Sequence, residues 1–187
     1  QWTLIAGYHG RTGEIDRILI GPYGVFAFEI KGNRGVINAN ANGWWVERYD
    51  RHGTLINAKQ LPRAPDAQLE KATASLQQWL KRNGIHERIS RIVLFAAEDA
   101  ALGRIEHSRA DWVVTLRGLD LGRLFLSGPH ASDGEHCDAE MRERIVGLVL
   151  KDHKFNAARQ RKPAPPVCSV KVWPPIGDAE NIASRRM

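Results

Sequence analysis

Residues Glu14–Lys31, EIDRILIGPYGVFAFEIK, read as a β-hairpin with an unusual amount of charge at its open end. Two apolar runs flank residues 21–24, GPYG. The proline of this turn fixes one φ angle, and its glycines permit the positive φ that tight turns often need. Counting outward from the turn pairs Ile20 with Val25 and Ile18 with Ala27.

The same register places two acids face to face. Asp16 falls opposite Glu29 and Glu14 opposite Lys31, and all four side chains share one face because side chains alternate along a strand. Like charges directly opposite each other repel, and a divalent cation bound by carboxylate oxygens would remove that repulsion. The alternative is that the acids point into solvent at the end of a sheet, that Glu14 pairs with Lys31, and that nothing binds.

The chain has 187 residues, of which 27 are Lys or Arg and 21 are Asp or Glu, so its formal net charge is +6. This length suits one domain with a substantial core. A basic surface attracts polyanions such as nucleic acid, although a solvated face without a partner explains the charge equally well. No apolar run approaches the ~18–20 residues of a membrane span. The two cysteines form no C-x-x-C spacing, so we expect an intracellular, cytoplasmic protein.

The remaining pattern predicts a mixed α/β fold. Leu69, Ala72, Thr73, Leu76 and Leu80 recur at helical spacing within residues 64–82. The other predicted elements are strands at 2–6, 35–38, 44–50, 54–56, 91–97 and 111–115, a short helix at 118–125 and a longer helix from 138 to at least 150. The segment after residue 155 is basic and rich in proline, so we expect a domain over 1–155 and a tail or arm over 156–187.

An aspartate, a hairpin and then E-x-K resemble the active-site core of the PD-(D/E)xK nuclease superfamily. More narrowly, GEIDRILIGPYGVFAFEIKGNRGVI, the later GWW and the segment NAKQLPRAPDAQLEKATASL resemble the NERD (nuclease-related) domain between about residues 13 and 80. The resemblance implies a restriction-endonuclease-like core, with a mixed central β-sheet flanked by helices. It also implies nuclease activity on DNA, with RNA as the alternative, and Mg²⁺ or Mn²⁺ as cofactor.

The resemblance assigns roles residue by residue. Asp16 and Glu29 match the metal-binding acids, and the main-chain carbonyl of Ile30 would complete the protein ligands. Lys31 matches the catalytic lysine, and Gln68 matches a glutamine that such sites often carry on a helix. The chemistry suits these residue types, because Mg²⁺ held by one or two carboxylates keeps several waters and can activate one of them. Lys31 would orient that water or stabilise the transition state.

One feature departs from the family pattern. The resemblance implies a helix before the hairpin that often bears a supporting glutamate, whereas the residues before Asp16 read as a strand. Either that helix is missing from the sequence or the site is incomplete, and Glu14 is the residue that would compensate. Two further hypotheses therefore stand beside a nuclease: a catalytically inactive module that binds nucleic acid or acts as a scaffold, and an assembly module in which the charged hairpin end is incidental.

Other candidate sites are weaker. His107, Ser108 and Asp111 lack the G-x-S-x-G turn of a hydrolase, and neighbours such as His136 and Cys137 do not face each other on a helix. Trp44 and Trp45 would stack on bases, or one would be core and the other half-exposed. The basic run 159–162, with Arg185 and Arg186, would grip phosphates or be a solvated tail.

Overall fold

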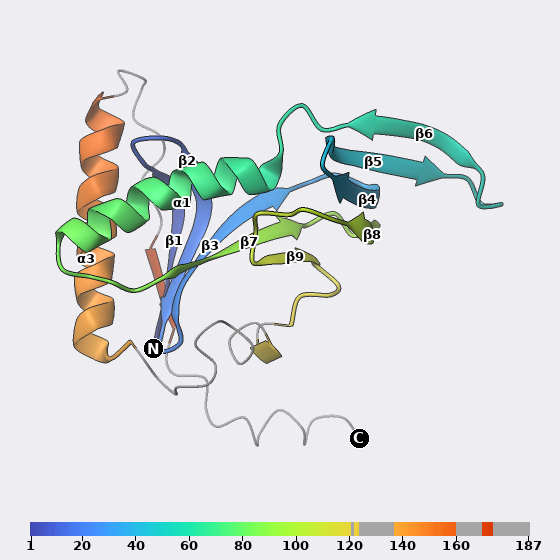
Figure 1. Cartoon of the computed structure of the whole chain (residues 1–187). Helices are drawn as coiled ribbons and strands as arrows, with labels where there is room; N and C mark the ends of the chain where they lie inside the picture. Colours follow the sequence, from blue (N-terminus) through green and yellow to red (C-terminus); the bar gives the residue numbers. More distant parts are fainter. Residues whose placement is uncertain (121, 124–136, 160–169, 174–187) are drawn as a thin grey trace, which may run out of the picture.

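The computed structural model describes residues 1–120, 122–123, 137–159 and 170–173 (Figure 1). Within them the elements, in chain order, are β1 (Trp2–His9), β2 (Glu14–Gly21), β3 (Gly24–Lys31), β4 (Gly35–Asn40), β5 (Gly43–Tyr49), β6 (Leu55–Gln60), α1 (Pro65–Arg82), β7 (Ile89–Phe95), β8 (Ala100–Ile105), β9 (Trp112–Thr115), α3 (Ala139–Arg159) and β10 (Val170–Trp173).

The strands form two sheets rather than one layer. The larger sheet has the order β10-β1-β2-β3-β7-β9, and the smaller has the order β6-β5-β4-β8. In the larger sheet β1, β2 and β3 are antiparallel neighbours, whereas β7 runs parallel to β3 and β9 runs parallel to β7. Figure 1 shows the smaller sheet projecting to one side of the larger one, beyond the N-terminal end of α1. The predicted mixed α/β class is confirmed.

The hairpin of residues 14–31 folds as its turn predicts. Ile20 pairs with Val25 and Ile18 with Ala27, and the ladder continues into the turn as far as Gly21 and Gly24. Gly24 has a φ of +110°, and a Cβ there would lie 2.9 Å from Oε1 of Glu87. Glycine is therefore favoured at this position by its backbone conformation, and a larger residue would also displace the Glu87 side chain.

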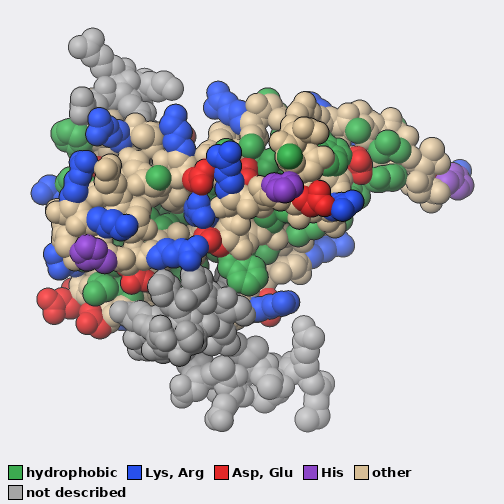
Figure 2. All heavy atoms as spheres, in the orientation of Figure 1, with side chains coloured by type: hydrophobic (Ala, Val, Ile, Leu, Met, Phe, Trp, Pro, Cys, Tyr) green, Lys and Arg blue, Asp and Glu red, His purple; other side chains and the backbone are tan. Residues whose placement is uncertain are grey.

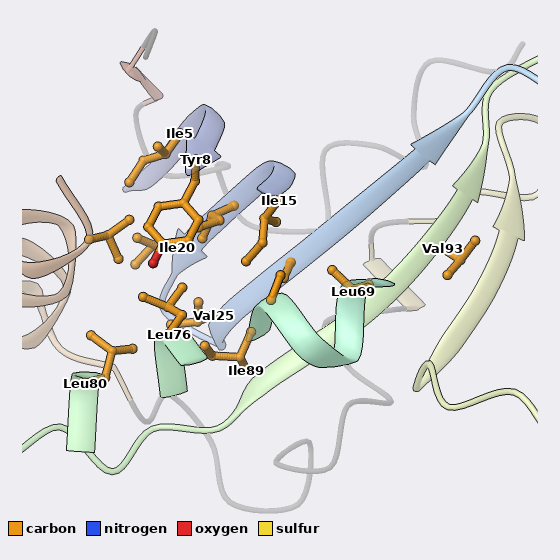
Figure 3. Packing of buried hydrophobic residues seen from close by; sticks show 14 of the residues in the cluster. Ile5, Tyr8, Ile15, Ile20, Val25, Leu69, Leu76, Leu80, Ile89 and Val93 are labelled. Carbon is orange, nitrogen blue, oxygen red and sulfur yellow. The ribbon is translucent and has the colours of Figure 1, made fainter. Parts of the chain in front are cut away.

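Helix α1 has the buried face that its spacing predicts: Leu69, Ala72, Thr73, Leu76 and Leu80 are all buried. Pro65 lies at its start, where a missing N–H costs nothing, and Gly84 follows its end with a φ of +77°. Both described helices pack on the same face of the larger sheet, where their apolar side chains join Ile5, Ile18 and Val25 in one core (Figure 3).

The opposite face of the larger sheet carries a second apolar cluster. Trp2, Phe26, Phe28 and Ile92 are buried there, with Leu19 and Ile30 packed against them. The hairpin therefore buries apolar side chains on both faces, which explains why β3 is buried over its first six residues. The sixth of these buried residues is the charged Glu29, and only Ile30 and Lys31 are partly exposed.

The C-terminal part of the chain differs from its prediction. Helix α3 continues to Arg159, and residues 170–173 form β10, which pairs antiparallel with β1. The segment expected as a tail over 156–187 therefore contributes the last turn of α3 and a strand of the larger sheet. The predicted short helix at 118–125 lies largely outside the described residues, as do most of the basic residues of the tail. Neither described helix combines the length and apolar character needed to cross a membrane.

Candidate active site

The strand alternation breaks next to Asp16. Ile15 and Ile18 belong to the same buried cluster although they are three positions apart, an odd spacing that places residues of a regular strand on opposite faces, so the strand between them cannot be regular. On β1, Ala6 pairs with Arg17 and Tyr8 with Ile15. Gly7 lies between them with a φ of +67°, a left-handed conformation that glycine adopts without strain. The distortion thus crosses both strands at the level of Asp16.

Asp16 is held against the next strand by its own side chain. The paired residues of β2 and β3 end at Arg17 and Phe28. Beyond it, the main-chain N–H of Ile30 donates a hydrogen bond of 2.7 Å to Oδ2 of Asp16. The carboxylate therefore takes the place of a main-chain acceptor at the end of the hairpin.

The carbonyl of Ile30 lies on the Asp16 side of β3. The N–H of Ala96, which follows β7, donates to the carbonyl of Lys31, so Lys31 directs its main-chain groups toward β7. Successive residues of a strand direct their N–H and C=O groups to opposite neighbours, and both groups of one residue point the same way. Since the N–H of Ile30 meets Asp16, the Ile30 carbonyl faces β2 as well.

Lys31 connects the hairpin to α1. Its Nζ donates to Oε1 of Glu29 at 2.5 Å and to Oε1 of Gln68 at 3.2 Å. The predicted position of Gln68, on the helix next to E-x-K, is therefore seen in the structure. The Glu29 side chain is 9% exposed and that of Lys31 is 26% exposed, so this ion pair is shielded from water on most sides.

Burial raises the pKa of the Glu29 carboxyl above its usual value. The hydrogen bond and charge of Lys31 lower that pKa, whereas the negative charges of Asp16 and then Glu14 raise it. The net shift is upward, so the ionised carboxylate is held at a cost. A second positive charge at this point would stabilise it.

A cleft of about 430 Å³ opens in front of these side chains. Its wall is formed by the β1–β2 turn, the open end of the hairpin and α1, through Thr12, Gly13, Glu14, Asp16, Glu29, Arg63, Gln68 and Lys71. Arg63 and Lys71 are exposed, and sequence reasoning did not select them for the site. The available signal was that Lys71 lies three residues beyond Gln68 and shares its helical face.

Glu14 does not pair with Lys31. Its Oε1 lies 3.1 Å from Nδ1 of His9, the residue opposite it in the β1–β2 register, and Lys31 is engaged by Glu29 and Gln68. The alternative in which Glu14 and Lys31 neutralise each other is therefore wrong. Glu14 remains on the wall of the cleft, close enough to influence the pKa of Glu29.

A hard divalent cation such as Mg²⁺ needs oxygen ligands, and the oxygen atoms near Asp16 and Glu29 are the candidates. In the described part of the chain, no three His, Cys, Asp or Glu side chains are arranged to hold a metal ion. The carboxylates of Asp16 and Glu29 line one cleft, and Ile30 follows Glu29 on β3. The hydrogen bonds to Ile30 and Lys31 use one oxygen of each carboxylate. This oxygen-rich set with open positions fits Mg²⁺, which commonly takes one or two carboxylates and keeps several waters.

The other sequence candidates have structural roles. Trp44 is buried, donates from Nε1 to Asp66 at 2.9 Å and lies 6.1 Å from the Phe95 ring, whereas Trp45 is half-buried. This confirms the interpretation that one tryptophan is core and the other half-exposed. Asp111 forms ion pairs with Arg88 and Arg91.

Cys137 is buried, and that burial raises the pKa of its thiol to about 11. Its sequence neighbours Glu135 and His136 lie outside the described residues. The thiol of Cys137 is therefore neither accessible nor ionised at neutral pH, which argues against a thiol site.

Residues 1–96, which contain both the hairpin and α1, match the family model of the nuclease-related domain, NERD. The chain belongs to the NERD family. No curated protein and no solved structure matches it. The family match confirms the resemblance inferred from the hairpin motif and agrees with a nuclease-like α/β fold. It also indicates a nuclease-related function for the NERD domain described here.

Proposed function

We propose that this NERD domain hydrolyses phosphodiester bonds of DNA, with RNA as the alternative substrate, in a reaction that depends on Mg²⁺ or Mn²⁺. The observation that carries the proposal is that Asp16, Glu29 and Gln68 line one cleft and that Lys31 donates hydrogen bonds to both Glu29 and Gln68. Membership of a nuclease-related family supports it.

Asp16, Glu29 and the carbonyl of Ile30 would hold the cation, which when bound supplies Lewis-acid stabilisation and an acidified water. Lys31 projects from the same strand, so its ammonium group would donate a hydrogen bond to the attacking water or to the phosphate as negative charge develops. Gln68 accepts a hydrogen bond from that ammonium and fixes its position. Arg63 and Lys71, on the cleft wall, would attract the phosphates that flank the scissile bond.

A second candidate function has its own supporting observation. Lys31 is already paired with Glu29 at 2.5 Å. A domain that binds nucleic acid without cleaving it would keep the basic cleft wall and use this ion pair only to join β3 to α1.

The deciding experiment is cleavage of supercoiled plasmid and single-stranded DNA with Mg²⁺, Mn²⁺ or EDTA. Glu29→Gln and Lys31→Met should each lower cleavage at least 100-fold, while Lys59→Met, which alters an exposed lysine on β6, should leave it unchanged. Thermal unfolding checks that all variants are folded. If the parent cuts neither substrate, or if both hairpin variants cut as fast as the parent, the enzymatic proposal fails and the binding module becomes the better description.

A further inference from the structure

A polar stripe runs along α1 away from the candidate active site. Gln68, Lys71, Ser75, Gln78 and Arg82 follow one another at steps of three or four residues, so they share one helical face. The stripe contains no acidic residue. Gln68 and Lys71 line the active-site cleft, whereas Ser75, Gln78 and Arg82 line a second cleft of about 300 Å³.

The β1–β2 turn lies between the two clefts. The hydroxyl of Thr12 donates a hydrogen bond of 2.8 Å to the carbonyl of Lys71, and a Cβ at Gly13 would lie 3.4 Å from that of Ala72. The turn is therefore packed directly on α1. Thr12 and Gly13 face the active-site cleft and Arg11 faces the second one, so the two clefts adjoin along the helix.

The second cleft is basic. Arg11 from the turn, Arg82 from α1 and Lys151 from α3 all lie on its wall and are exposed. Its carboxylate, Asp152, is 9% exposed and accepts a hydrogen bond from the hydroxyl of Tyr8. Figure 2 shows Lys and Arg side chains spread over the part of the surface where Figure 1 places α1 and α3.

These cations differ from the arginines elsewhere around α1. Arg91 and Arg109 form ion pairs with Glu70, and Arg88 pairs with Asp111. Among the described residues, none of Arg11, Arg82 and Lys151 forms an ion pair. Three positive charges that form no ion pair within the described part of the chain are available to an anionic ligand.

The second cleft also contains aromatic surface. Phe155 on α3 is 60% exposed on its wall, and half-buried Trp79 of α1 lies beside it. An exposed aromatic ring among basic side chains is typical of proteins that bind unpaired bases, because a base can stack on the ring while its phosphates meet the cations. The bases of a duplex are already stacked on each other and do not reach such a ring.

We propose that the stripe on α1 and the second cleft bind an unpaired nucleic-acid strand that continues from the active site. This inference rests on the proposed function, which identifies the cleft of Asp16 and Glu29 as the place where the strand is cleaved. In the inferred complex, Arg11, Arg82 and Lys151 contact phosphates and Phe155 stacks on a base. At 1.5 Å per residue the helix carries the stripe about 21 Å from Gln68 to Arg82, which corresponds to about six nucleotides at the spacing of a B-form strand.

The test measures binding without catalysis. Fluorescence anisotropy with labelled single-stranded oligonucleotides of 4 and 12 nucleotides, in EDTA, gives the affinity of the full chain at several salt concentrations. The triple variant Arg11→Gln/Arg82→Gln/Lys151→Gln should reduce the slope of log affinity against log salt by about 2 for the 12-mer, because each lost phosphate contact contributes about 0.7. The parent should bind the 12-mer more tightly than the 4-mer, whereas the triple variant should bind the two oligonucleotides with similar affinity.

A matched control removes the same charge elsewhere. Arg48→Gln/Arg51→Gln/Lys59→Gln alters three cations of the smaller sheet and the loop within it, and it should keep the parental slope. The variant Arg11→Lys/Arg82→Lys, which retains charge, should also keep it. Phe155→Ala should weaken binding of the 12-mer about 10-fold and leave a 12-base-pair duplex unaffected.

Three results would overturn the inference. They are absence of 12-mer binding by the parent, an unchanged salt slope in the Arg11/Arg82/Lys151 variant, and equal losses for single strand and duplex in Phe155→Ala, which would assign the surface to duplex. Because EDTA removes catalysis from the assay, a chain that binds as expected but never cleaves DNA would refute the proposed hydrolysis and leave this binding surface standing.

Discussion

Oδ2 of Asp16 accepts a hydrogen bond of 2.7 Å from the main-chain N–H of Ile30, two residues beyond Phe28, where the β2–β3 pairing ends. One carboxylate oxygen is thereby fixed to β3, while Asp16 lines the cleft together with Glu29. The bond explains how two acids can be held close together at the end of a hairpin despite their mutual repulsion.

Two substitutions at Asp16 separate this structural bond from metal binding. Asp16→Asn keeps an oxygen that can accept from Ile30 but loses the charge, so we expect a folded protein whose Mn²⁺ affinity falls at least 10-fold. Asp16→Ala also leaves the N–H of Ile30 without its acceptor and should lower the free energy of unfolding by a further ~1–3 kcal/mol. Titration calorimetry with Mn²⁺ and urea unfolding measure the two effects, and equal Mn²⁺ affinity in Asp16→Asn and the parent would contradict the assignment.

The raised pKa of Glu29 predicts the pH dependence of cation binding. Protons and metal compete for this carboxylate, so Mn²⁺ affinity should fall as the pH drops through a midpoint above the ordinary glutamate value of 4.5. Lys31 lowers that pKa, so Lys31→Met should move the midpoint to higher pH. Calorimetric titrations between pH 4.5 and 8 test both statements, and a midpoint that moves downward in Lys31→Met would be inconsistent with the ion pair.

The raised pKa of Glu29 also predicts that the folded chain becomes more stable when the charge of Glu29 is removed. Since the folded-state pKa of Glu29 is raised, the folded chain binds this proton more tightly than the unfolded chain, and stability falls as the pH rises above about 4.5. Glu29→Gln removes the charge that burial disfavours. Without metal, its melting temperature should exceed that of the parent at pH 7, and the gain should shrink below pH 4.5. Thermal melts at the two pH values check this sign.

The periodic parts of the fold could be read from the sequence. The register of the hairpin followed from the turn, and the buried face of α1 followed from helical spacing, because both depend on local geometry. The distortion at Gly7 could not be predicted, since it appears only when β1 and β2 are paired. Strand β8 was missed because four of its six residues are exposed and carry no apolar alternation. Strand β10 pairs with β1 from the far end of the chain, a relation that local pattern does not contain.

At the candidate active site, the hairpin motif identified the functional residues on β2 and β3 but not the other charged residues around them. Asp16, Glu29, Lys31 and Gln68 come together as the family resemblance implied. Arg63, before α1, lies within the segment that resembles the NERD domain but was given no role there, and tertiary packing places it at the cleft. The contact of Glu14 with His9 depends on the neighbouring strand β1, which motif reasoning from the hairpin alone did not consider.

Gln68 is predicted to act by positioning Lys31. Gln68→Ala removes an acceptor 3.2 Å from Nζ, so the ammonium group gains freedom while its charge remains. We expect kcat for DNA cleavage to fall about 10-fold with Mn²⁺ affinity unchanged, and Gln68→Asn to give the same direction because its shorter side chain does not reach. Gln60→Ala, which alters an exposed glutamine of β6 outside both clefts, is the matched control and should retain the parental kcat. A loss of Mn²⁺ affinity in Gln68→Ala would instead make Gln68 part of the metal site.

The N-terminal end of α1 is anchored by a buried carboxylate, and the anchor should determine where Gln68 lies. Oδ1 of Asp66 accepts from Nε1 of Trp44 at 2.9 Å, and Oδ2 accepts from the N–H of Arg109 at 2.8 Å. Asp66 is 4% exposed, so Asp66→Ala leaves two donors without their acceptor and should lower the free energy of unfolding by about 3 kcal/mol. Urea unfolding measures this loss. Because Gln68 follows two residues later, the folded variant should also cleave DNA more slowly at a temperature well below its melting point. Asp66→Asn keeps one oxygen that can accept a hydrogen bond and should lose about half as much stability, whereas equal losses in Asp66→Ala and Asp66→Asn would show that the charge of Asp66 is what holds the helix.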